Sequence, residues 1–206
     1  MSLRASFLIA VGLICVLAPP LAAQTPAPQP PQGNPRLLAE HRRLAFLMGQ
    51  WDEEITYAGR EPADAKGQGR WQARPEMGLY LALRYEGWGP EGEYHAMGVL
   101  TWDREQQAYR LWWFDDAGGI GEYRGNFRDE NSLVLEHHGK VDGRDFRERI
   151  TYTRAAPGEV HTRIEQAYGN EDYKLYLEAV AHRTEMPQRP GARPMQRPGG
   201  NPPPPR

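Results

Sequence analysis

Residues 46–59 read FLMGQWDEEITYAG, and this stretch joins the end of a helix to the start of a strand. An apolar run leads up to Gly49, and glycine is a common helix terminator. From Trp51 onward apolar and polar residues alternate, which is the period of a half-buried strand. The stretch therefore predicts a helix that ends at Gly49 and a strand over residues 51–58.

The residues before Gly49 predict one short amphipathic helix. Asn34-Pro35 is typical of a helix start, with asparagine as the N-cap and proline in the first turn. Apolar residues then recur on one side at helical spacing: Leu37, Leu44, Leu47 and Met48.

The remainder of the chain reads as strands separated by turns rich in Gly, Asp and Asn. Alternating runs cover residues 51–58, 67–73, 79–87, 94–102, 109–115, 120–127, 133–138, 146–154, 160–168 and 173–183. Short turns predict an antiparallel meander, and closure is an economical way to remove its edges. We therefore predict an all-β fold, an antiparallel up-and-down barrel of about ten strands with one short N-terminal α-helix. A two-sheet sandwich is the alternative that periodicity leaves open.

Residues 1–23 have the features of an export signal. Arg4 is followed by an apolar core over residues 6–17, which is too short to span a bilayer. Leu21-Ala22-Ala23 offers a small-residue cleavage site, and we expect cleavage after Ala23. The expected location is periplasmic or secreted, without stable membrane insertion after cleavage. Cys15, the single cysteine, lies in this segment, so no disulfide is expected in the mature chain.

Composition sets the limits of the folded part. Residues 24–35 form a Pro-rich leader and residues 185–206 a Pro/Arg/Gly-rich tail, and both are expected to be disordered. The predicted domain covers residues 36–184. The chain carries 25 basic and 27 acidic side chains, and Arg4 and the tail arginines lie outside this domain. The domain is therefore acidic, which argues against nucleic acid as a partner.

Several motifs resemble a known family when their order is taken into account. They are Gly49-x-Trp51 within Leu47-Met48-Gly49-Gln50-Trp51, then Tyr85-Glu86-Gly87, Gly98-Val99-Leu100-Thr101-Trp102-Asp103, Tyr109-x-Leu111-x-Trp113-x-Asp115, and a last strand ending in Arg183. Gly49-x-Trp51 is similar to the signature of lipocalins and other calycins. Over residues 40–183 the chain resembles the bacterial lipocalin-like family labelled domain of unknown function 1579. The resemblance implies a lipocalin-like barrel with the helix near one end, and it supplies no reaction.

The resemblance also implies how the barrel is closed at one end. In calycins the signature tryptophan packs under an arginine of the last strand, and Trp51 and Arg183 would fill these roles next to Gly49. An inward Trp51 puts Glu53, Ile55 and Tyr57 inward as well. The same rule gives further inward sets: Leu79, Leu81, Leu83, Tyr85; Tyr109, Leu111, Trp113, Asp115; Phe146, Glu148, Ile150, Tyr152; Val160, Thr162, Ile164, Gln166; and Leu175, Leu177, Ala179, Ala181. Tyr176 and His182 would face outward, and for residues 94–102 both faces are half apolar.

These sets predict an aromatic lumen with a few polar groups. The candidate ligand-binding residues are Tyr57, Tyr85, Trp113, Asp115, Glu148, Tyr152 and Gln166. Apolar walls with a few orienting polar groups are typical of a small-molecule pocket, so we expect a small hydrophobic ligand. The alternative is a barrel filled by its own side chains.

Catalysis and haem binding are the other functions considered. Asp115 and Glu148 could perform general acid–base chemistry on a lipid-like or aromatic substrate, or they could bond to neighbouring tyrosines and arginines. No catalytic residue is predicted, and no ligand spacing for a metal is present. Related barrels include haem-binding nitrobindin-like proteins, and His95 and His137 are the candidate axial ligands. No cofactor other than haem is considered, and the sequence leaves the oligomeric state open.

Overall fold

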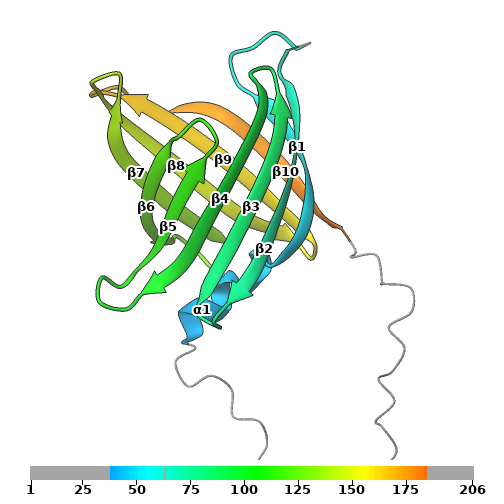
Figure 1. The fold of residues 1–206 in the computed structure, drawn as a ribbon, viewed down its shortest axis with the longest axis vertical. Helices are drawn as coiled ribbons and strands as arrows, with labels where there is room; N and C mark the ends of the chain where they lie inside the picture. The colour runs from blue at the N-terminus through cyan, green and yellow to red at the C-terminus, as the bar shows by residue number, and fades with distance from the viewer. Residues whose placement is uncertain (1–37, 63, 185–206) are drawn as a thin grey trace, which may run out of the picture. The chain divides into compact units, whose positions relative to one another are not determined.

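The computed structural model describes residues 38–62 and 64–184, in which ten antiparallel strands close into one barrel (Figure 1). Each strand pairs with its sequence neighbours, and the first strand pairs with the last. The elements are α1 (Ala39–Arg43), the 3₁₀ turn η1 (Leu44–Leu47), β1 (Gly49–Tyr57), β2 (Lys66–Glu76), β3 (Tyr80–Gly89), β4 (Gly92–Asp103), β5 (Ala108–Asp115), β6 (Ile120–Phe127), β7 (Ser132–Val141), β8 (Arg144–Ala156), β9 (Glu159–Tyr168) and β10 (Lys174–Thr184). The predicted up-and-down barrel is confirmed, and the two-sheet sandwich is not formed.

The predicted signal segment, leader and tail lie outside the described residues. So does the expected helix start at Asn34-Pro35. Within the described part of the chain, no helix has the length and apolarity needed to cross a bilayer.

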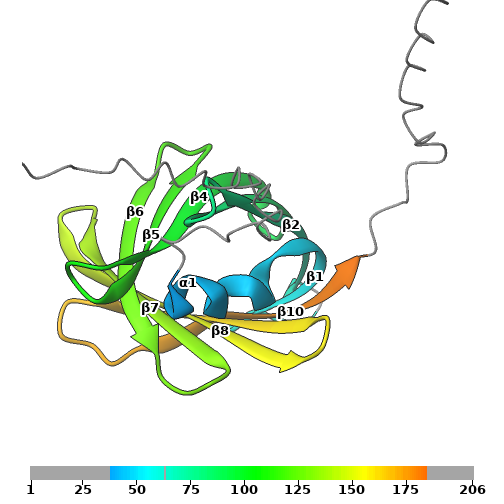
Figure 2. The same ribbon diagram turned by 90° about the horizontal axis from the view of Figure 1, so that it is seen from below.

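The helical segment covers one end of the barrel, which we call the closed end (Figure 2). The turns between β1 and β2, and between β3 and β4, lie at the opposite, open end (Figure 1). α1 is shorter than predicted, because the chain tightens into η1 at Leu44. The Tyr109 hydroxyl donates a hydrogen bond to the Glu40 carbonyl at 2.9 Å and so ties α1 to β5.

Gly49 does not end the helix as predicted, because Met48 is already extended and Gly49 is the first residue of β1. Its φ of +130° lies in a region that favours glycine. A Cβ at this position would also lie 2.7 Å from Nη1 of Arg183. Gly49 therefore provides the space into which the Arg183 guanidinium fits.

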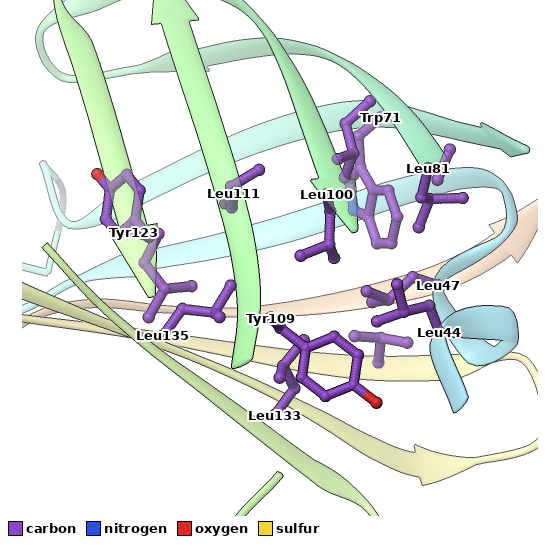
Figure 3. Packing of buried hydrophobic residues seen from close by; sticks show 14 of the residues in the cluster. Leu44, Leu47, Trp71, Leu81, Leu100, Tyr109, Leu111, Tyr123, Leu133 and Leu135 are labelled. Atoms are coloured by element: carbon purple, nitrogen blue, oxygen red, sulfur yellow. The ribbon is translucent and has the colours of Figure 1, made fainter. Parts of the chain in front are cut away.

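Trp51 is the centre of the closed end, with 1% of its surface exposed. Its ring stacks on Trp71 at 5.0 Å between centroids, and its indole nitrogen donates to the Leu47 carbonyl at 2.9 Å. The Arg183 guanidinium carbon lies 4.5 Å from the Trp51 ring, a cation–π contact. Figure 3 shows the leucines that complete this core, among them Leu44 and Leu47 from the helical segment.

Alternation along the strands sets which side chains enter the barrel. Trp51, Glu53 and Ile55 are buried while their neighbours on β1 are exposed. On β4, which the sequence left undecided, Leu100 is fully buried and pairs with Leu81 and Leu111. The even-numbered residues of β4 therefore face the lumen.

The start of one predicted strand and one inward assignment differ from the structure, and in both cases the cause is local backbone structure. Leu79 lies in the turn before β3 rather than in the strand. A bulge between Leu175 and Leu177 shifts the register of β10 on β9. Leu175 consequently pairs with outward-facing Glu165, while the ring of Tyr176, expected outside, packs against Tyr57 at 5.8 Å.

Candidate functional site: the open half of the lumen

The side chains that face the lumen change character along the barrel axis. On β3 the inward sequence runs from Leu81 and Leu83 to Tyr85, and on β5 it runs from Leu111 to Trp113. The closed half is therefore sealed by leucine and tryptophan, whereas the other half carries hydroxyl, carboxyl and amide groups. We define this open half of the lumen by its residues: Glu53, Tyr85, Tyr94, Trp113, Tyr123, Glu148, Tyr152 and Gln166.

Several inward side chains of the open half of the lumen keep exposed surface. Tyr152 lies within β8, opposite Leu133 on β7 and Thr162 on β9, and it faces the barrel interior. Leu133 is fully buried, yet Tyr152 is only half-buried, as are Trp113 and Gln166. Because these side chains point inward, their exposed surface lies inside the barrel. The side chains of the open half are thus less completely buried than those of the closed half.

Glycines on inward positions keep this space open. A Cβ on Gly69 would lie 2.7 Å from the Tyr85 hydroxyl and 3.0 Å from Oε2 of Glu53. A Cβ on Gly121 would lie 2.6 Å from the Tyr123 ring. The tyrosine rings therefore lie along the wall over glycines, which lets them line the lumen instead of crossing it.

Glu53 is the most deeply buried acid of the site, with 6% of its surface exposed. Burial raises the pKa of its carboxyl to about 7, and hydrogen bonds from Tyr85 and Thr162 only partly oppose this effect. The strand partners of Glu53 are Gly69 on β2 and Ala181 on β10, neither of which carries a charge. Glu53 was expected to point inward but was not among the predicted site residues.

Glu148 provides the second carboxyl group of the lumen. One carboxylate oxygen accepts a hydrogen bond from the Tyr123 hydroxyl at 2.6 Å, and the other accepts one from the Gln166 amide at 2.7 Å. Burial, followed by the charge of Glu148, raises the pKa of Tyr123. Tyr123 was missed in the sequence, although its alternation with Gly121 and Gly125 on β6 would have placed it inward.

The aromatic side chains of the site contact one another. The indole nitrogen of Trp113 donates to the Tyr94 hydroxyl at 2.8 Å. The Tyr85 ring lies 5.9 Å from the Tyr94 ring and 6.3 Å from the Trp113 ring. Burial is the main reason why the pKa of Tyr94 rises to about 12. Tyr94 comes from the strand whose direction the sequence left open.

Two predicted site residues lie at the rim rather than inside. Oδ1 of Asp115 accepts the backbone N–H of Gly119 at 2.7 Å and so shapes the turn between β5 and β6. Tyr57, at the end of β1, packs against Tyr176 and lies 5.7 Å from the Arg60 guanidinium carbon. Of the predicted set, Tyr85, Trp113, Glu148, Tyr152 and Gln166 lie together in the open half of the lumen.

The two histidines considered for haem lie on opposite faces of the wall. His95 is on the outer face of β4, where Nε2 lies 3.0 Å from Glu93, so it does not face the lumen. His137 faces inward, with Nδ1 2.9 Å from the Glu122 carbonyl oxygen. Its Nε2 points along the wall, because a Cβ on Gly139 would lie only 2.6 Å from it. Across residues 38–62 and 64–184, no three His, Cys, Asp or Glu side chains gather as a metal site would require.

Charged groups on the outer wall are arranged differently from those in the lumen. A recess of about 820 Å³ lies over the outer faces of β7 to β10. Arg149 contacts Glu136 there at 2.8 Å, and Arg163 contacts Glu178 at 2.5 Å. These acids and bases neutralise each other, whereas Glu53 and Glu148 form no such pairs with any residue of 38–62 and 64–184.

The comparisons with known proteins concern the family and the fold. A family model described as "Protein of unknown function (DUF1579)" matches residues 36–176. The crystal structure of Rv2717c from M. tuberculosis is similar, with a TM-score of 0.53 and 14% identity over 72% of this chain and 99% of that one. The phycobiliprotein lyase CPES from Guillardia theta gives a TM-score of 0.46 and 13% identity over 70% and 92% of the two chains. A search of curated proteins returned no match.

Proposed function

We propose, from the premise that this chain belongs to the family described as protein of unknown function DUF1579, that it binds a small hydrophobic or aromatic molecule inside its barrel. The observation that carries the proposal is the contrast within the lumen. Leucines seal the closed half, while Tyr85, Tyr94, Tyr152 and Trp113 of the open half keep exposed surface. Aromatic walls with a few convergent polar groups are the usual composition of a small-molecule site.

Binding is a better account of this site than catalysis. Both oxygens of Glu148 are engaged by Tyr123 and Gln166, and Asp115 is engaged by a turn amide. Neither acid bonds to an arginine within the described residues, so the expected arginine partners are replaced by tyrosine, glutamine and backbone. Glu53 has a pKa near neutrality, which suits a general base. Among the described residues, however, only hydroxyl groups face Glu53 closely, and a second acid–base group is not positioned beside it.

Haem binding is less well supported than binding of a purely organic ligand. It would depend on His137, because His95 lies on the outer wall. The direction of the His137 Nε2 atom, along the wall toward Gly139, does not suit an axial ligand. A Soret shift on addition of hemin that is lost in His137→Ala would overturn this reasoning.

The proposal is tested by narrowing the lumen. Ala96 faces inward between Tyr85 on β3 and Asp115 on β5, whereas Ala82 faces outward on β3. We expect Ala96→Leu to weaken binding of a neutral fluorescent probe, N-phenyl-1-naphthylamine, by about tenfold, which corresponds to roughly 1.4 kcal/mol. Ala82→Leu adds the same side chain outside and is expected to leave the affinity unchanged. Equal affinities for the two variants, each still folded by circular dichroism, would contradict lumenal binding.

We also propose that the protein is exported, because residues 1–23 have the composition of a signal segment. Fractionation of expressing cells and N-terminal sequencing of the mature protein test this. A mature N-terminus at Gln24 in the periplasm or medium is the expected result. A chain in the cytoplasm that retains its first residues would refute it.

A further inference from the structure

We infer that the molecule bound in the lumen is an organic cation, an amine or quaternary ammonium joined to an aromatic or apolar body. The inference rests on the proposed function and names the chemical class of its ligand. Two observations carry it, namely the absence of basic partners for the lumenal acids and the aromatic rings that surround those acids.

The described residues place basic side chains beside the acids of the outer wall but not beside those of the lumen. On the outside, Arg110 pairs with Asp103 at 3.1 Å, Arg163 with Glu178 and Arg149 with Glu136. Glu53 and Glu148 take part in none of the ion pairs formed within residues 38–62 and 64–184. The site therefore holds carboxyl groups without a protein cation.

Both carboxyls lie beside tyrosine side chains of the lumen. A Cβ on Gly69 would lie 2.7 Å from the Tyr85 hydroxyl and 3.0 Å from Oε2 of Glu53, and the Tyr123 hydroxyl donates to Glu148 at 2.6 Å. Burial, and then the charges of Glu53 and Glu148, raise the pKa of the Tyr152 hydroxyl. Glu53 comes from β1 and Glu148 from β8, and β10 and β9 lie between these two strands in the closed sheet. Tyr152 is half-buried, and its hydroxyl is not among the buried polar atoms that lack a hydrogen-bond partner within residues 38–62 and 64–184. Its exposed surface can contact a ligand in the lumen.

Aromatic rings line the space around these acids. Tyr85, Tyr94 and Trp113 form a continuous group, with ring centroids 5.9 and 6.3 Å apart. The faces of such rings carry partial negative charge and attract ammonium groups, most strongly where water is excluded. Rings and carboxylates together therefore favour a positive charge from two directions.

Ligands of other charge fit this site less well. An anion would meet two carboxyls and no guanidinium. A neutral apolar molecule would cover both carboxyls without compensating them, which costs free energy. A cation would pair with carboxyls that folding has already removed from bulk water. An ion pair inside the lumen is stronger than one at the protein surface, because the effective dielectric constant is lower there.

The groups that face Glu53 predict how this preference depends on pH. They are Tyr57 on its own strand, Tyr85 on β3, Tyr152 on β8 and Thr162 on β9. Gly69 on β2 and Ala181 on β10 contribute no titratable group. None of these residues is a base, so the carboxyl becomes charged only as the pH rises through about 7, and cation binding should tighten over that range.

The experiment compares three naphthalene probes of nearly equal size on the full chain: 1-naphthylmethylammonium, 1-naphthalenemethanol and 1-naphthoate. Isothermal titration at about pH 8 should show the cation binding about tenfold more tightly than the neutral alcohol, and the anion most weakly. Glu53→Gln and Glu148→Gln should each reduce that preference. Glu54→Gln is the matched control, because Glu54 is the next residue and faces outward.

The outcomes separate the two proposals. If the alcohol binds as tightly as the cation, the inferred ligand class is wrong while lumenal binding stands. If none of the three probes binds, the proposed function itself is refuted. If one glutamine variant does not fold, the inference is tested by the other variant and by the wild type. The wild-type preference for the cation over the alcohol should increase as the pH rises through about 7, and a preference that does not change with pH would contradict the inference. A preference that Glu54→Gln abolishes as strongly as Glu53→Gln would place the cation on the outer wall and overturn the inference.

Discussion

Replacing Glu53 by glutamine should stabilise the protein at alkaline pH. Burial raises the pKa of this carboxyl from its ordinary value of 4.5 to about 7. The folded state therefore holds a proton that the unfolded state has lost between these pH values, so unfolding becomes easier as the pH rises. With roughly 1.4 kcal/mol for each pKa unit, the charged Glu53 destabilises the fold by about 3 kcal/mol above pH 7.

Glutamine has nearly the same shape as glutamate and carries no charge. The free energy of unfolding of Glu53→Gln should exceed that of the wild type by an amount that grows between about pH 5 and pH 8 and then stays constant. Below about pH 5 both Glu53 and glutamine are neutral in the folded state, so the gain is smallest there. Urea denaturation followed by tryptophan fluorescence, at a series of pH values and without added ligand, measures this difference.

Glu54→Gln supplies the control for this measurement. Glu54 is exposed on the outer face of the same strand, so its replacement should change stability by a small amount. A difference between wild type and Glu53→Gln that stays flat from about pH 5 to pH 9 would refute the argument that the carboxyl is held desolvated in the lumen.

Three further predictions concern the closed end and the second carboxyl. Trp51→Ala removes a fully buried ring, so it should lower the free energy of unfolding by about 3–5 kcal/mol, measured by thermal or urea unfolding. Probe binding should fall only because part of the protein is unfolded. Loss of binding at an unchanged melting temperature would make Trp51 part of the site. Gly49→Ala should cost about 1–3 kcal/mol, because its φ of +130° is unfavourable for alanine and the new Cβ would meet Arg183; stability equal to wild type would show that the guanidinium has another position. Tyr123→Phe removes the hydroxyl that donates to Glu148 and should cost about 1–2 kcal/mol in urea unfolding; an unchanged midpoint would mean that water replaces the hydroxyl without loss.

Strand number and most inward faces could be predicted from the sequence because alternation is a local property of the backbone. Trp51, Glu53 and Ile55 follow one another at period two, and on β8 Glu148 contacts Tyr123 in the lumen while the next residue, Arg149, contacts Glu136 on the outer wall. The bulge in β10 could not be predicted in this way. The bulge is a register shift between β10 and β9, and the sequence of one strand does not specify its register on the neighbouring strand.

Pairing also determined which face of β4 enters the lumen. Both faces of residues 94–102 are half apolar, so periodicity gave no preference. In the closed barrel Leu100 pairs with Leu81 and Leu111, and this places Tyr94 in the site.

The amino-acid sequence by itself predicted an antiparallel meander, and its resemblance to a known family implied a barrel with Trp51 and Arg183 at one end. Only the tertiary structure brought Glu53, Glu148 and Tyr152 into the same half of the lumen, where neither carboxyl forms an ion pair within residues 38–62 and 64–184. Those residues belong to β1 and β8, which are distant in the sequence and become near neighbours only because the sheet closes. Local alternation sets whether a side chain points inward, but the neighbours that it finds there, and hence its acidity and its possible ligand, depend on closure.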